Sequence, residues 1–418
     1  MGSLAFGMKR TPFHERTSVL NEVRLWQHWV GYLAATRYQP SATVEYYAVR
    51  NTVGVFDASP LFKYRILGPD ATELLTYVFT RDIRTCAVGG SHYTVWCDAR
   101  GHVVEDGVVL RIAADDYLLT AARPNLRYLS RYAAKMDVQL TDISEEFGLL
   151  AVQGPHAFDV VEAVTAEPIR LSYFGVTITR IGNVEVIVSR TGYTGDLGYE
   201  IWVPASGALA VWDALFAAGA HLRILPVGLE ALDIARIDAG LLQIDVDFTS
   251  SRFASIDAER ETPIELGLGW MLRGIRGGDR DFVGRDAMLG EIETRATRWQ
   301  TVGIMLDVES YERTYAGCGL IPPKEGVLIR GSLGLYSSDL DEHPGGSYVG
   351  YGTSLSWSPI LKRHIAIAKL PVDVAAQGGE VYVELTVAHR PRYVGARVTP
   401  MPFYDPPRKV AATGGGAR

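Results

Sequence analysis

The sequence contains little cysteine. Cys86, Cys97 and Cys318 are the only three among 418 residues. None has a partner at the close spacing of a thiolate zinc site, and an odd, sparse set does not form a disulfide framework. The histidines also lie singly, so no metal site is predicted. We therefore expect a protein that folds without disulfides or a structural metal, as in the reducing cytoplasm.

Long apolar runs are missing as well. No stretch approaches the roughly 18 consecutive apolar residues that a membrane helix requires. Residues 1–17 lack the apolar core and cleavage pattern of a signal peptide. These features favour a cytoplasmic protein with no membrane contact.

The sequence also lacks an excess of positive charge. The 41 lysines and arginines are outnumbered by 48 aspartates and glutamates, which gives a net charge of −7. Nucleic-acid-binding proteins carry a basic face, so no nucleic-acid partner is expected. A locally basic pocket for a small anion remains compatible with this composition.

The chain is long enough for two or three domains. Short β-branched runs alternate with helical runs, which predicts an α+β fold. The expected helices are 20–35, 44–51, 70–78, 156–164 and 207–218. The expected strands are 54–57, 61–67, 92–97, 103–112, 147–153, 176–180 and 184–190. From residue 300 onward, short strands with Gly/Pro turns predict a small barrel. A polar stretch at 279–285 places the domain boundary, giving domains 1–285 and 286–418.

One acid lies on an otherwise apolar strand face. In VVEDGVVLRI (103–112), Asp106 shares its face with Val104, Val108 and Leu110, while Glu105 points to the other side. An acid in such a place costs several kcal/mol unless it is paired or used. It is either a structural partner or a pocket carboxylate that accepts a proton or holds a cationic ligand nitrogen. The strand pattern leaves both interpretations open.

The segment RTGYTGDLGYE (190–200) is rich in glycine and tyrosine. Its glycines, Gly192, Gly195 and Gly198, allow positive φ and close approach of the backbone. A rigid aromatic loop of this kind is either a plain connection or one wall of a planar ligand's site. No Gly-Lys-Ser/Thr follows, so it is not a phosphate loop.

Taken together, the motifs resemble those of the aminomethyltransferase (T-protein) family of the glycine cleavage system. In family order they read YYAVRNTVGVFDAS, ILGPDATELL, VVEDGVVL, AVQGPHAFDVVE, RTGYTGDLGYEI, PVGLEALDIARIDAGL, TPIELGLGWML, YVGYGTSLSWSPILKRHIAIA and MPFY. They cover residues 44–404. The resemblance implies a three-domain cloverleaf with a C-terminal β-barrel and tetrahydrofolate in a central hole.

The resemblance also implies a folate pocket walled by tyrosines and two acids. The matching positions are Tyr93, Asp106, Tyr173, Tyr193, Glu200 and Trp270. Aromatic faces would enclose the pterin, and Glu200 would accept hydrogen bonds from its amino-pyrimidine edge. Asp106 would lie near the reactive folate nitrogens and stabilise positive charge. Asp106, Tyr93 and Tyr193 are the catalytic candidates.

The sequence departs from the family's glycine-cleavage members on the expected substrate side. Ala122 stands where those members have Asn, Leu232 where they have Arg, and Ile244 where they have Tyr. The usual Asp-Asp pair reads Glu105-Asp106. Residues 24–43, which include Trp26, Trp29 and Tyr32, and residues 58–64 also differ.

These departures predict a divergent member similar to the tetrahydrofolate-dependent demethylases. It would move a methyl group from a small O-, S- or N-methyl compound to tetrahydrofolate, and the aromatic residues of 24–43 make an aromatic methyl ether one candidate donor. The alternatives are a glycine-cleavage-type aminomethyltransferase and a non-catalytic folate-binding protein.

Overall fold

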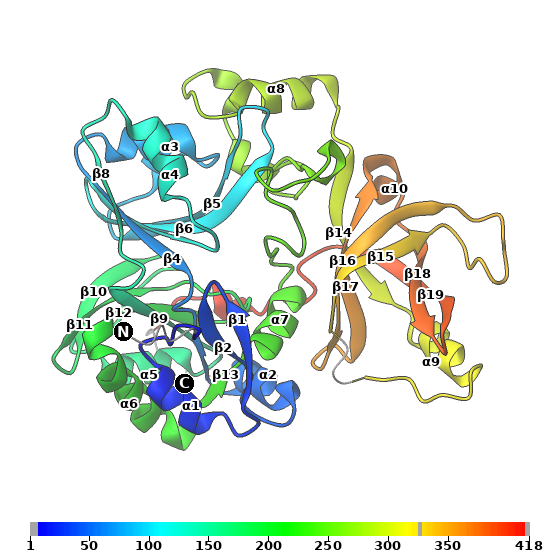
Figure 1. Ribbon diagram of the computed structural model, residues 1–418, viewed down its shortest axis with the longest axis horizontal. Coiled ribbons are helices and arrows are strands. Elements are labelled where there is room, and N and C mark those ends of the chain that lie inside the picture. Colours follow the sequence, from blue (N-terminus) through cyan, green and yellow to red (C-terminus); the bar gives the residue numbers. More distant parts are fainter. Residues whose placement is uncertain (1–6, 325–327, 414–418) are drawn as a thin grey trace, which may run out of the picture.

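The computed structural model describes residues 7–324 and 328–413. Its ribbon has three lobes, each built around its own β-sheet (Figure 1). Two lobes come from the N-terminal part of the chain, and a barrel forms the third. This arrangement is the predicted α+β cloverleaf with a C-terminal barrel.

The first sheet has six strands in the order β10-β11-β12-β9-β3-β13. Its strands are β3 (Gly54–Asp57), β9 (Phe147–Gln153), β10 (Val176–Ile181), β11 (Val184–Ser189), β12 (Gly198–Pro204) and β13 (Leu225–Val227). The helices of this lobe are α1 (His14–Leu20), α2 (Ala42–Asn51), α5 (Ala157–Val164) and α6 (Ala208–Gly219). Helices α5 and α6 pack on β12, and their apolar sides share one buried core with the sheet.

The second sheet is inserted between two neighbouring strands of the first. Its order is β5-β6-β7-β4-β8, and all five strands lie between β3 and β9 in the sequence. The strands are β4 (Phe62–Leu67), β5 (Gly90–Cys97), β6 (Val103–Ala113), β7 (Asp116–Ala121) and β8 (Gln139–Asp142), with helices α3 (Ala71–Val78) and α4 (Leu126–Ala133). The two N-terminal lobes are therefore interleaved in sequence.

The third lobe is a closed six-stranded barrel, β14-β17-β16-β15-β18-β19. Its elements are β14 (Trp299–Leu306), β15 (Leu328–Tyr336), β16 (Tyr348–Ser358), β17 (Arg363–Pro371), β18 (Glu380–Val387) and β19 (Arg390–Thr399), with helices α9 (Val308–Ala316) and α10 (Val372–Gln377). Helix α8 (Arg285–Thr294) lies between the second sheet and the barrel along the chain. The boundary at 285/286 stays a prediction.

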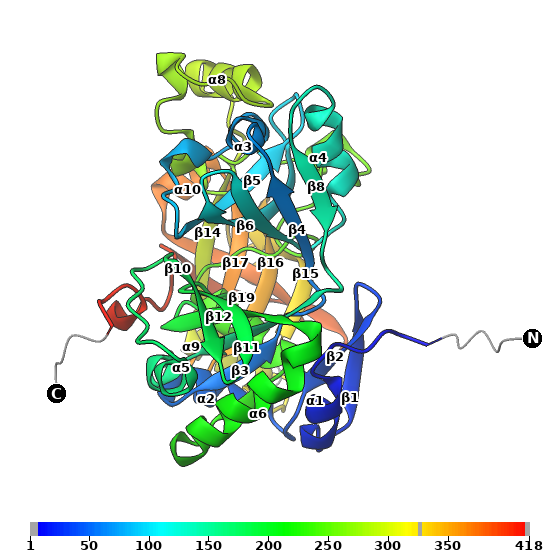
Figure 2. The same ribbon diagram turned by 90° about the vertical axis from the view of Figure 1, so that its left-hand side faces the viewer.

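Two elements join the lobes at the centre. Helix α7 (Leu229–Asp238) packs against α2 and against barrel strand β16. The loop that follows contributes Leu242 and Ile244 to a core shared by the second sheet and the barrel. The side view shows the barrel strands behind the two N-terminal sheets, with the β1–β2 hairpin at the edge of the first lobe (Figure 2).

The predicted helix at 20–35 is wrong. These residues form a hairpin of β1 (Leu25–Trp29) and β2 (Tyr32–Arg37), and the preceding helix α1 ends at Leu20. Val30 and Gly31 both have positive φ, 50° and 87°, which is the geometry of a tight hairpin turn. The apolar spacing of this segment fits a helix, but the segment folds as two paired strands joined by a tight turn instead.

One helical stretch, Ala205–Leu222, is long and apolar enough to cross a membrane by length and composition alone. Its core is α6, whose Val211, Trp212 and Leu215 are buried against the first sheet. One side of this stretch therefore packs on the first sheet, and 28% of it is buried.

Candidate functional site

A cavity of about 2020 Å³ opens at the junction of the three lobes. It exceeds the roughly 300–1,000 Å³ of a typical small-molecule pocket, so it has room for a large cofactor together with a second ligand. All six predicted site residues line it: Tyr93, Asp106, Tyr173, Tyr193, Glu200 and Trp270.

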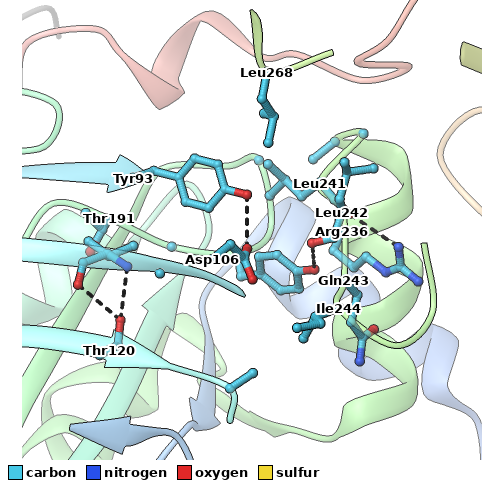
Figure 3. A pocket seen from close by; sticks show the side chains of 18 of the residues that line it. Tyr93, Asp106, Thr120, Thr191, Arg236, Leu241, Leu242, Gln243, Ile244 and Leu268 are labelled. Carbon is cyan, nitrogen blue, oxygen red and sulfur yellow. Dashed lines mark hydrogen bonds between the residues drawn. The ribbon is translucent and has the colours of Figure 1, made fainter. Parts of the chain in front are cut away.

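Asp106 is placed in the cavity by strand β6. It pairs with Val95 of β5, and its side chain points to the same side as that of Tyr93. The Tyr93 hydroxyl donates a hydrogen bond of 3.0 Å to Asp106 Oδ2 (Figure 3). Burial raises the pKa of Asp106 above its usual range, although the bond from Tyr93 opposes this shift. The carboxyl can therefore exchange a proton closer to neutral pH than an exposed aspartate.

Glu105 points to the opposite side of the same strand, as alternation predicts. It is 1% exposed, its Oε2 accepts a bond of 3.3 Å from Asn125, and its Oε1 accepts one of 3.2 Å from the Asp106 backbone. Burial, and then the charge of Asp106, raise the pKa of Glu105 well above its usual range. Glu105 is thus a buried, protonated acid outside the cavity lining, and Asp106 is the acid that reaches the cavity.

The raised pKa of Glu105 predicts how the stability of the fold depends on pH. Below the unfolded-state pKa of about 4.3 both states bind the proton; as pH rises, the unfolded state loses it first and the folded state loses stability. Glu105→Gln removes this pH-dependent loss of stability. The free energy of unfolding of the variant, relative to that of the wild type, should therefore increase from pH 5 to pH 8, with a limiting slope of about 1.4 kcal/mol per pH unit. Urea unfolding at both pH values measures it. A stability difference that stays flat between the two pH values would contradict the assignment.

Tyr193 reaches the same part of the cavity from the loop between β11 and β12. Its hydroxyl donates a bond of 2.5 Å to the Leu242 carbonyl in the loop after α7. Burial raises the pKa of Tyr193 well above its usual range, and Asp106 contributes to the same shift. Tyr193 is therefore a neutral, fixed ring close to Asp106.

The loop that carries Tyr193 is built around a residue whose importance the sequence did not indicate. Gln153 is buried; its Nε2 donates to the Thr191 carbonyl at 3.2 Å, and its Oε1 accepts from Thr194 Oγ1 at 2.8 Å. A Cβ on Gly192 or Gly198 would lie within 2.2 Å of Gln153 Oε1. Close packing on this amide thus requires both glycines.

The three glycines divide between the two uses that glycine allows, positive φ and close approach of the backbone. Gly195 alone of the three has positive φ, at 69°. Gly192 and Gly198 are the two that Gln153 approaches closely.

Glu200 lies on β12 with its carboxylate in the cavity wall. Among the described residues, Thr191 alone donates to it, onto Oε2, and Thr191 is itself fixed by a 2.6 Å bond to Ser189. Burial raises the pKa of Glu200. A half-buried carboxylate with so few donors is suited to a ligand that brings N–H groups.

Tyr173 and Trp270 form the rim of the cavity. Their side chains are 42% and 44% exposed. The ring of Tyr173 meets that of Phe174 edge-on at 4.7 Å, and the Arg81 guanidinium lies 5.2 Å from the Trp270 ring. Arg81 also donates to the Tyr93 carbonyl at 3.3 Å, and no carboxylate among the described residues forms an ion pair with it, so the rim offers aromatic faces beside a cation without an anionic partner.

Arg236, which we did not single out from the sequence, ties the site to the barrel. It is fully buried, donates to Asp233 Oδ1 at 2.6 Å and to Ser354 Oγ at 2.8 Å, and forms an ion pair with Asp247. Arg330 of β15 donates to the other oxygen of Asp233 at 2.5 Å. This network fixes α7, and with it one cavity wall, against the barrel.

Family models match most of the chain. Residues 12–274 match the GCVT N-terminal domain, and residues 318–405 match the glycine cleavage T-protein C-terminal barrel domain. The chain belongs to the aminomethyltransferase T-protein family. This membership confirms the resemblance and the coarse prediction of a folate-dependent transferase.

Relatives of this T-protein-family chain carry different names. It is 32% identical to an aminomethyltransferase of Symbiobacterium thermophilum, over 96% of this chain and 99% of the relative. It is also 32% identical to a trimethylamine-oxide aldolase of Ruegeria pomeroyi, over 95% of this chain. This chain spans only 47% of the length of that second relative.

A solved structure shows the same fold. The aminomethyltransferase T of the glycine cleavage system from Bartonella henselae superimposes with a TM-score of 0.78 at 24% identity, covering 96% of this chain and 99% of that one. This likeness supports the family architecture.

The departures from the T-protein pattern converge in space. Ala122, Leu232 and Ile244 come from three different segments, yet all three line the cavity. At each position a side chain without hydrogen-bonding groups replaces the polar residue that the family resemblance implies. The structure thus gathers these sequence differences in one site.

Proposed function

We propose that this protein moves a methyl group from a small O-, S- or N-methyl compound to tetrahydrofolate. The observation that carries this proposal is the mixed lining of one cavity. It combines the acids Asp106 and Glu200 and several aromatic rings with apolar residues at Ala122, Leu232 and Ile244, where the family resemblance implies polar ones.

The residues present fit tetrahydrofolate. Glu200 is a half-buried carboxylate that accepts from Thr191 alone among the described residues, and Tyr93 and Tyr193 offer flat faces. Arg81 is a cation without an anionic partner at the rim, where it could meet a carboxylate tail. When bound, the cofactor supplies a nucleophilic N5 that accepts the one-carbon unit.

The chain's own groups then orient the two reactants and transfer protons between them. Holding two reactants side by side is worth several kcal/mol of the barrier. Asp106 favours positive charge next to it, and its raised pKa lets it carry a proton between acceptor and leaving group. The Tyr93 hydroxyl, bonded to Asp106, is the nearest proton donor, whereas the Tyr193 proton is held by the Leu242 carbonyl.

A second candidate is glycine-cleavage-type aminomethyl transfer, favoured by the name of the Symbiobacterium relative. A non-catalytic folate-binding protein is less well supported, because such a role needs no proton-exchanging acid beside the folate site.

The reaction product distinguishes these functions. Purified protein, tetrahydrofolate and a panel of methylated compounds should give 5-methyltetrahydrofolate, detected by mass spectrometry. Formation of 5,10-methylenetetrahydrofolate with ammonia from an aminomethylated lipoyl carrier would instead support the glycine-cleavage reaction. Folate binding without either product would support the binding protein.

A further inference from the structure

The outer face of the barrel carries three tyrosines that lie together. Tyr336 of β15, Tyr348 of β16 and Tyr393 of β19 are neighbours of residues that fill the barrel core, such as Leu335 and Val394. Because side chains alternate along a strand, the three rings face outward. Tyr348 is 57% exposed, and the other two rings are half-buried. We call these three residues the tyrosine cluster.

The rings of the tyrosine cluster meet nearly at right angles. The centroids of Tyr336 and Tyr348 are 5.8 Å apart with the planes at 82°, and those of Tyr336 and Tyr393 are 5.2 Å apart with the planes at 81°. Tyr348 lies opposite Tyr336 in the β15–β16 pair, and β18 separates β15 from β19. Perpendicular rings form a corner in which one small group can contact two aromatic faces.

Carboxylates lie beside these rings. Glu384 of β18 is paired with Tyr393 across the β18–β19 ladder. The pKa of Tyr393 is raised by burial and then by the charges of Glu384, Asp341 and Asp339. Asp341 forms an ion pair with Arg392 at 2.7 Å, whereas Glu384 and Asp339 form none among the described residues. The edge of the tyrosine cluster is therefore negatively charged.

A second group of tyrosines in this chain already holds a cation. On the second lobe, Tyr132 meets the rings of Tyr77 and Tyr128 edge-on, at 5.8 Å and 5.2 Å between centroids. The Arg131 guanidinium lies 5.9 Å from the centroid of Tyr132. In the part of the chain that the structure describes, no lysine or arginine makes such a contact with the tyrosine cluster of the barrel. Its ring faces are open to a cation from outside.

We propose that the tyrosine cluster binds a quaternary ammonium ion, such as the trimethylammonium group of choline, with Glu384 as the counter-charge. The negative face of a tyrosine ring attracts such a cation. A primary ammonium would also have to satisfy three N–H donors, and ring faces satisfy none of them well.

The proposed site is separate from the central cavity. None of the three tyrosines lines that cavity, and strands β18 and β19 lie on the side of the barrel away from the two N-terminal lobes (Figure 1). The inference is therefore independent of the proposed methyl transfer to tetrahydrofolate, and it holds whichever one-carbon unit the cavity handles.

The decisive comparison is between choline and its uncharged carbon analogue, 3,3-dimethylbutan-1-ol. The two compounds have nearly the same shape, so a difference in affinity reports attraction to the positive charge. Ligand-observed NMR titration of the whole protein measures both. We expect choline to bind at least about fivefold more tightly, as cation–π attraction together with a nearby carboxylate predicts. Equal affinities, or no binding of choline, would overturn the proposal.

Variants locate the binding site. Tyr336→Leu keeps an apolar side chain but removes the aromatic face, and Glu384→Gln removes only the charge. We expect each to weaken choline binding about threefold or more. Tyr348→Leu, at an exposed position, gives the same test should Tyr336→Leu fail to fold, as judged by circular dichroism. Tyr77→Leu, in the second group of tyrosines, is the matched control and should leave the affinity unchanged.

Two further outcomes would contradict the assignment. Choline binding that survives Tyr336→Leu and is lost in Asp106→Asn would place the ammonium ion in the central cavity, whose acid Asp106 also has aromatic neighbours. A peptide with an unmethylated lysine that binds as tightly as choline would show that this face docks a basic protein segment instead. Loss of binding confined to the variants of the tyrosine cluster and Glu384 would support the proposal.

Discussion

Replacing Asp106 with asparagine is expected to lower the turnover number about 10²–10³-fold. The substitution keeps the size of the side chain and its hydrogen bond from Tyr93, but it removes the negative charge and the exchangeable proton. Preorganised charge beside a reacting centre is typically worth this factor. The measurement is single-turnover formation of methylated folate at saturating tetrahydrofolate, with folate affinity determined separately by titration.

The neighbouring acid supplies the control for this prediction. Glu105→Gln alters a buried, protonated side chain on the other side of the same strand, and we expect its turnover to stay within about threefold of the wild type. A loss of turnover equal to that of Asp106→Asn would show that the two neighbouring carboxyls act together, because each affects the pKa of the other. A loss of folate affinity with unchanged turnover in Asp106→Asn would point to a binding role instead.

The orientation of this acidic pair could be predicted from the sequence because it depends on local geometry. Side chains alternate along any strand, so Asp106 and Glu105 had to lie on opposite sides. Alternation could not say which side faced a cavity, because that depends on the other lobes. The family motifs supplied this missing information, and the structure places the predicted residues in one cavity.

Other parts of the site depend on contacts distant in sequence and could not be predicted. Gln153 resembles an ordinary turn residue until the loop around Tyr193 folds over it. Arg236 acquires its role only when Ser354 of the barrel meets α7. The hairpin at Leu25–Arg37 has helix-like apolar spacing, and its pairing competes successfully with that local preference.

Replacing Glu200 with glutamine is expected to weaken tetrahydrofolate binding about 10–100-fold. The wild-type carboxylate is held by Thr191 and has unused acceptor capacity in the cavity. Charge-assisted hydrogen bonds contribute about 1.5–3 kcal/mol, roughly twice a neutral one, and an amide offers only one acceptor oxygen to the paired N–H groups of a pterin. Fluorescence titration measures the affinity, and Glu185→Gln at an exposed acid of neighbouring β11 is the matched control.

The pH dependence tests the same assignment independently. Because burial raises the pKa of Glu200, its carboxylate takes up a proton at a higher pH than an exposed glutamate does, and the protonated form can no longer accept two hydrogen bonds. The affinity of the wild type for tetrahydrofolate should therefore fall as the pH is lowered toward 5, whereas that of Glu200→Gln should respond less. Parallel pH profiles for the two proteins would mean that another group controls folate binding, and Glu200 would then have a structural role as the acceptor that fixes Thr191.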